Sequence, residues 1–203
     1  MKKFVSCKLS VVSHARGQSM IEMLIATSVI VVSLLAILAL VNRSLGLNRV
    51  IADQYTGTYL AEEGIEVMKN FYDRSYLATS GGNFYGAQGA NAIADGVYRV
   101  AYNSAVLNAT CSATIPAALD EPAVDAIFES CGSNPLMLDP SGFYGYTGTT
   151  QTKFERLVIV KKSSTGSQPT PLELTVVSAV RWATKGGTSL VRLEDKFLPW
   201  RMP

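Results

Sequence analysis

The sequence predicts an α+β protein in which a long N-terminal helix packs on a C-terminal antiparallel sheet. Three observations lead to this prediction. A run of twenty uncharged, mostly apolar residues follows Glu22, apolar residues at helical spacing continue beyond that run, and segments with strand-like patterns lie near the C-terminus. The length of 203 residues suits one or two small domains.

Composition and charge exclude several classes of function. The single histidine, His14, lies in a basic stretch at the N-terminus, so the body of the chain has none for a catalytic triad or a histidine-rich zinc site. The sequence has no phosphate-binding loop, no dinucleotide-binding glycine pattern and no CxxC pair. We therefore expect a protein that is not an enzyme and that has no catalytic residue, metal or cofactor.

The apolar run between Glu22 and Arg43, MLIATSVIVVSLLAILALVN, predicts a helix that spans a membrane. At about 1.5 Å per residue, twenty residues cover roughly 30 Å of hydrocarbon, and only a helix satisfies its own backbone there. Residues 1–17 carry a charge of +4, which places the N-terminus in the cytoplasm and the C-terminal part outside. A cleaved secretory signal is disfavoured, because the run is long and residues 39–42 match a signal cleavage site poorly.

Residues 15–40, ARGQSMIEMLIATSVIVVSLLAILAL, resemble the N-terminus of type IV pilins and type II secretion pseudopilins. The resemblance implies that residues 1–17 are a cytoplasmic leader and that prepilin peptidase cuts between Gly17 and Gln18. It also implies that Glu22 is the family's glutamate at the fifth mature position. The new amine is usually N-methylated in the family, although Gln18 stands where many members have Phe.

Cleavage after Gly17 would create an α-amine close to the carboxylate of Glu22. In a bundle of such helices, the amine of one subunit can pair with Glu22 of its neighbour and neutralise both charges. Only one axial stagger brings the two groups together, so the pair would set the register of assembly.

The helix is expected to continue beyond the membrane. Residues 18–42 would be its transmembrane half and residues 43–78 its amphipathic half. One face of the amphipathic half would dock on the sheet and its membrane-proximal part would pack in a filament; the alternative is the amphipathic helix of any anchored domain. Gly46, Gly57 and Gly64 predict local bending or melting. The residues that share one face at helical spacing are Leu47, Ile51, Thr58, Ala61, Ile65, Met68 and Tyr72.

Residues 79–203 are expected to form a β-rich head outside the membrane. Residues 79–96 read as a loop, and strands are predicted at 96–102, 154–162, 172–183 and 189–197. Apolar and polar residues alternate in the third of these, as in a half-buried strand, and Lys185–Thr188 predicts a hairpin turn. Residues 176–200, VVSAVRWATKGGTSLVRLEDKFLPW, cover most of the last two predicted strands and the turn between them. They also resemble the terminal hairpin of pilin-like proteins.

Cys111 and Cys131 flank an acidic stretch that lacks lysine. If the leader is removed, Cys7 leaves with it and the exported part carries an even pair. An oxidising exterior would allow a disulfide, which the family often uses to staple a variable region. Two free thiols are the alternative.

The charged residues of the head have a specific and a general interpretation. The acids of residues 100–152, Asp120, Glu121, Asp125, Glu129 and Asp139, fit a solvated surface loop better than a calcium loop or a catalytic pair. The basic residues near the last strands could bind DNA phosphates, but the polar face and edges of a sheet are favoured. These residues are Lys153, Arg156, Lys161, Lys162, Arg181, Lys185 and Arg192.

The sequence therefore predicts a structural subunit of a type IV pilus or a type II secretion-like filament, with Gln18 and the irregular middle favouring a minor pilin or a pseudopilin. The expected location is the cytoplasmic membrane, crossed once, and then the filament. The implied partners are prepilin peptidase, other pilin or pseudopilin subunits, the inner-membrane assembly platform and membrane lipid. The alternatives are an anchored binding domain that never polymerises and a DNA-uptake pilin that binds nucleic acid.

Overall fold

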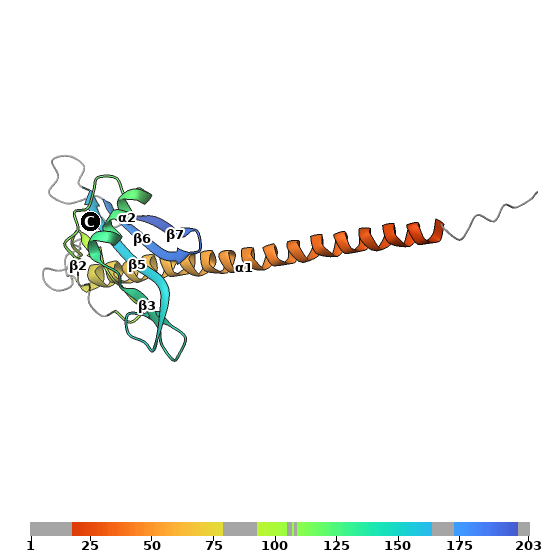
Figure 1. Ribbon diagram of the computed structural model, residues 1–203. Coiled ribbons are helices and arrows are strands. Elements are labelled where there is room, and N and C mark those ends of the chain that lie inside the picture. The colour runs from red at the N-terminus through yellow and green to blue at the C-terminus, as the bar shows by residue number, and fades with distance from the viewer. Residues whose placement is uncertain (1–17, 79–92, 105–106, 108, 164–172, 199–203) are drawn as a thin grey trace, which may run out of the picture. The chain divides into compact units, whose positions relative to one another are not determined.

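The computed structural model describes residues 18–78, 93–104, 107, 109–163 and 173–198. The expected leader, residues 1–17, and most of the expected loop after the helix lie outside the described residues. The layout is α+β, as predicted (Figure 1). In chain order the elements are α1 (Gln18–Ala78), β1 (Gly96–Tyr98), β2 (Ala109–Cys111), α2 (Glu121–Cys131), β3 (Pro135–Leu138), β4 (Tyr144–Gly145), β5 (Thr150–Ser163), β6 (Glu173–Thr184) and β7 (Gly187–Phe197).

The chain divides into two compact units, residues 1–51 and residues 52–203. The first unit contains the N-terminal part of α1, and the second contains the rest of α1 with all the strands and α2. Helix α1 runs through Gly46, Gly57 and Gly64 without interruption, so the melting expected at these glycines is not found. The C-terminal part of α1 therefore belongs to the same compact unit as the sheet.

The sheet is antiparallel throughout and is centred on β5. Strands β5, β6 and β7 form a meander in which Val158 faces Ser178 and Ser178 faces Leu193. The other edge of β5 is shared, because β3 pairs with its first half and β1 with its second half. Strand β2 then pairs with β1, and β4 pairs with β3.

The predicted strands agree with β5, β6 and β7 to within four residues, and the predicted hairpin is present. Thr184 pairs with Gly187, which leaves Lys185 and Gly186 as a two-residue turn. Strand β1 ends at Tyr98 rather than at residue 102. Strands β2, β3 and β4 were not predicted, because segments of two to four residues carry too little periodic signal.

Helices cover both faces of the meander. Within the second unit, α1 packs against Val158, Val160 and Trp182 on one face, while α2 packs against Leu157 and Ile159 on the other. Strand β6 is buried on both faces, since Val177 and Ala179 lie under α2 and Val176 and Val180 lie under α1. The prediction of a half-buried strand was wrong, because it did not include α2.

Helix α2 replaces the solvated loop that the acidic residues suggested. Its start is encoded locally: the Asp120 side chain accepts a hydrogen bond from the Ala123 amide, and a proline occupies the first turn. Val124, Ile127 and Phe128, at helical spacing, are its buried residues. Gly132, with a φ of 68°, ends the helix. The acids of α2 lie on its exposed side.

Candidate functional site

The N-terminal part of α1 is a continuous exposed apolar surface. Its large apolar side chains, from Met20 to Ile51, each expose 49–74% of their area. An exposed apolar surface of this extent marks a membrane-contacting or protein-contacting segment. The helix is also long and apolar enough to cross a membrane once.

Three hydroxyl side chains within this apolar segment are satisfied by the helix itself. The hydroxyl groups of Thr27, Ser28 and Ser33 donate hydrogen bonds to the carbonyl oxygens of Met23, Ile25 and Val29, at 2.9, 2.8 and 2.7 Å. Because each of these three hydroxyl groups donates to the backbone of its own helix, none needs a partner outside the helix. The segment is therefore suited to an apolar environment.

The predicted processing residues lie at the start of α1. Gly17 lies outside the described residues, and Gln18 is the first residue of the helix. Glu22 is an exposed residue of the same helix, four positions further on. Residues four apart lie on the same side of a helix, one above the other. The carboxylate of Glu22 is therefore one turn from the backbone nitrogen that a cut after Gly17 would turn into an amine.

The C-terminal part of α1 approaches the sheet through two glycines. A Cβ on Gly57 would come within 2.6 Å of the Trp182 ring, and a Cβ on Gly64 would come within 2.2 Å of Ser178 Oγ. Ala61, Ile65, Met68 and Tyr72 of the predicted apolar face are buried at this contact. Leu47 and Ile51, at the membrane-proximal end of the predicted face, are exposed, and Thr58 is half-buried.

Arg156 of β5 joins α1 to the segment that follows β1 from inside the core. It is 1% exposed, and its Nη1 donates to the Leu60 carbonyl at 2.9 Å. Its Nη2 donates to the Glu63 carboxylate at 3.3 Å and to the Val100 carbonyl. The expectation that Arg156 belongs to a surface basic patch was wrong. The alternation of apolar residues along β5 places this position on the buried face, and this was the available signal.

Most other basic residues of the expected patch have partners within the chain. Lys153 pairs with Asp53, and Arg192 pairs with Glu194. Lys161 Nζ donates to the carbonyls of Pro116 and Ala117. Arg181, packed over the Phe128 ring at 4.7 Å, pairs with three carboxylates: Asp125, Glu129 and Glu155. These pairs reduce the positive charge that a nucleic acid would meet.

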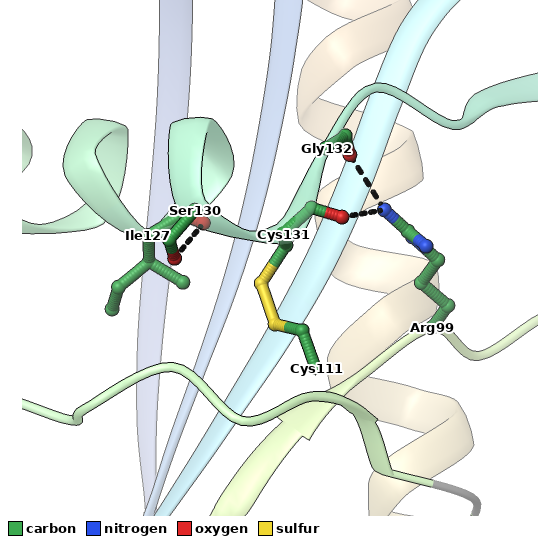
Figure 2. The surroundings of a disulfide bond; sticks show 6 residues. All are labelled: Arg99, Cys111, Ile127, Ser130, Cys131 and Gly132. Atoms are coloured by element: carbon green, nitrogen blue, oxygen red, sulfur yellow. Dashed lines mark hydrogen bonds between the residues drawn. A yellow bond between two sulfur atoms is a disulfide. The ribbon is translucent and has the colours of Figure 1, made fainter.

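A disulfide joins Cys111 of β2 to Cys131 at the end of α2, with their Cα atoms 5.4 Å apart (Figure 2). Beside it, Arg99 Nη2 donates to the carbonyl oxygens of Cys131 and Gly132, at 3.0 and 2.7 Å. An arginine at the C-terminus of a helix donates hydrogen bonds to carbonyls that have no partner within the helix. Its positive charge also interacts favourably with the negative end of the helix dipole. The disulfide and Arg99 together fasten the C-terminus of α2 to the edge of the sheet.

Comparison with known proteins gave no matching family model, curated protein or solved structure. Within the described ranges, no group of three or more His, Cys, Asp or Glu residues is placed to hold a metal ion. The features of the chain that bear on its function are the apolar helix, the residues at its start and the head that follows.

Proposed function

We propose that the protein is a structural subunit of a type IV pilus or a type II secretion-like filament, made as a membrane precursor and cut after Gly17. The observation that carries this proposal is the position of Glu22. It lies one helical turn from Gln18, at the start of an exposed apolar helix that continues without a break to Ala78.

The exposed apolar part of α1 needs a cover at every stage. Lipid covers it in the membrane, and neighbouring copies of the same helix can cover it in a filament. A lone carboxylate in either setting costs a few kcal/mol. The amine created by cleavage is the partner that offsets this cost, and pairing it with Glu22 of a neighbour fixes how far the two helices are staggered.

The head is firmly attached to the C-terminal part of this helix. The α1 segment from Gly57 to Tyr72 is packed on the sheet, and Arg156 of β5 bonds to its backbone and to the backbone just after β1. A subunit of this kind does no catalysis. Its partners would be prepilin peptidase, other pilin or pseudopilin subunits, the inner-membrane assembly platform and lipid. The head would face away from the cytoplasm, and a minor subunit remains our favoured assignment.

A membrane-anchored binding domain that never polymerises is the second candidate. It is favoured by the fact that one exposed apolar helix is sufficient for an anchor. In that case Glu22 would have no partner to meet. A DNA-uptake pilin is a variant of the first proposal. It is disfavoured because Lys153, Arg181 and Arg192 form ion pairs within the chain, which reduces the positive charge available to a nucleic acid.

Replacing Glu22 separates the two candidates. We expect Glu22→Ala and Glu22→Gln to insert in the membrane normally but to be lost from sheared filament fractions. Glu66→Gln is the matched control, because Glu66 is an exposed glutamate further along the same helix. Absence of the unmodified chain and of all three variants from the sheared fraction, with normal membrane insertion, would favour the anchored domain. Incorporation of all three variants at the level of the unmodified chain would contradict the role assigned to Glu22.

A further inference from the structure

Two exposed aromatic rings lie together on the surface of the head. Tyr102 and Phe143 are 48% and 55% exposed, and their ring centroids are 4.9 Å apart with planes tilted by 33°. Most aromatic side chains of the described head, such as Phe154 and Trp182, are buried instead. An exposed pair of rings is costly in water and is typical of a contact site.

Asp139 bonds to the Tyr102 side chain and to the Phe143 backbone. Its Oδ2 accepts a hydrogen bond from the Tyr102 hydroxyl at 3.0 Å, and its Oδ1 accepts from the amides of Ser141 and Phe143, at 2.8 and 3.0 Å. The backbone adds a bond in which the Asp139 amide donates to the Phe143 carbonyl at 3.0 Å. The loop between β3 and β4 is thus fixed, and a ligand would not have to order it on binding.

The charged groups that influence the Tyr102 hydroxyl are negative. The two charged groups that raise the pKa of Tyr102 are both carboxylates, Asp139 and Glu63. The backbone bond from Phe143, with the other bonds it accepts, lowers the pKa of Asp139, so this carboxylate is ionised at neutral pH. An anionic ligand would be repelled here, and a cation would be attracted.

Aromatic faces beside a carboxylate are the chemistry that recognises an organic cation. A ring face attracts an ammonium or a guanidinium group, and a guanidinium also stacks on the ring. We propose that Tyr102, Phe143 and Asp139 form a docking site for a lysine or arginine side chain on a segment of a partner protein. This site does not depend on whether the chain polymerises.

The test is an NMR titration of the full chain with tri-arginine, following the ring signals of Tyr102 and Phe143. Polyoxyethylene-ether micelles are suitable, because their detergent carries neither a cation nor a sugar. We expect these ring signals to shift on titration and the affinity to fall as salt is raised. Phe143→Leu and Asp139→Asn should each weaken binding about two- to five-fold, and the double variant about ten-fold.

Two control variants remove an exposed ring or an exposed carboxylate outside the proposed site. Tyr59→Leu removes an exposed ring, 67% exposed on α1, and Glu121→Gln removes an exposed carboxylate on α2. Both should bind tri-arginine as the unmodified chain does. In Asp139→Asn the side-chain amide oxygen can still accept hydrogen bonds from the loop amides. Unchanged backbone signals outside residues 139–143 would verify the fold of this variant. Ring signals that tri-arginine leaves unmoved, variants that bind normally, or a larger shift with the neutral sugar hexa-N-acetylchitohexaose would each overturn the proposal.

Discussion

Gly64 of α1 lies directly against Ser178 of β6, with room for a hydrogen atom but none for a methyl group. A Cβ built on Gly64 falls 2.2 Å from Ser178 Oγ and 3.2 Å from the nearest methyl of Val158. Ser178 is fully buried, and its Oγ has no hydrogen-bond partner among the described residues. The glycine therefore sets how closely the helix and the sheet approach each other.

Gly64→Ala should lower the free energy of unfolding of the head by about 1–3 kcal/mol, because the added methyl overpacks this contact. The loss should be smaller in a Ser178→Ala background, which removes the atom that the methyl meets first. Denaturant unfolding of the full chain in micelles, followed by Trp182 fluorescence, measures the difference. Gly46→Ala is the control, since nothing lies within 4 Å of a Cβ at that position. Equal stability of Gly64→Ala and the unmodified chain would show that the contact is loose.

Arg156→Met should cost about 3 kcal/mol or more in the same measurement. The change fills a similar space but leaves the Glu63 carboxylate and the carbonyls of Leu60 and Val100 without their donor. Lys153→Met is the matched control, because the Lys153–Asp53 pair is partly exposed and such a pair contributes about 0–1 kcal/mol. Similar losses for the two variants would contradict the role assigned to the buried guanidinium.

Removal of the disulfide should destabilise the head by about 3 kcal/mol, the chain-entropy value for a loop of this length. Cys111 and Cys131 are 20 positions apart, and α2 lies within the loop they close. Cys111→Ser combined with Cys131→Ser should therefore increase hydrogen exchange in α2 more than in β5 or β6. Uniform exchange across the head, or unchanged stability, would argue against the fastening of α2 through this bond.

Asp139 should make the stability of its loop depend on pH in the acid range. Bonds from the Phe143 and Ser141 amides and from Tyr102 hold its pKa below the ordinary value of 3.8, so the unfolded chain binds this proton more readily than the folded chain. Its contribution is then fully present above about pH 4 and is lost as pH falls through the folded pKa. Asp139→Asn should flatten this part of the curve of loop stability against pH, as followed by NMR of residues 139–143. An unchanged curve would place the acid sensitivity elsewhere.

The sequence was sufficient for the features that repeat over many residues. Helix α1 was predicted from the twenty uncharged residues after Glu22. The meander was predicted from the alternation around Val176 and Val180 and from the two glycines of the hairpin. These signals are strong because a long helix or strand repeats its pattern several times. The Cys111–Cys131 pairing was one of two alternatives that the sequence left open, and the structure contains the bond.

The features that the sequence analysis missed depend on contacts between distant segments. Gly57 and Gly64 were interpreted as weak points of the helix, although they serve close approach to Trp182 and Ser178. Arg156 was counted as a surface cation, because its partners lie on α1 and after β1. Helix α2 was the avoidable omission, since Asp120 and Pro122 are a helix start signal followed by apolar residues at the right spacing.

Mapping of the N-terminus in native membranes shows whether the chain is processed as a pilin-type precursor. Intact mass and N-terminal peptides would be measured with and without prepilin peptidase. With pilin-type processing, we expect a chain that begins at Gln18 only when the peptidase is present. A chain that begins at Met1 in both cases, or at a site beyond residue 39, would contradict it and leave an anchored or secreted domain.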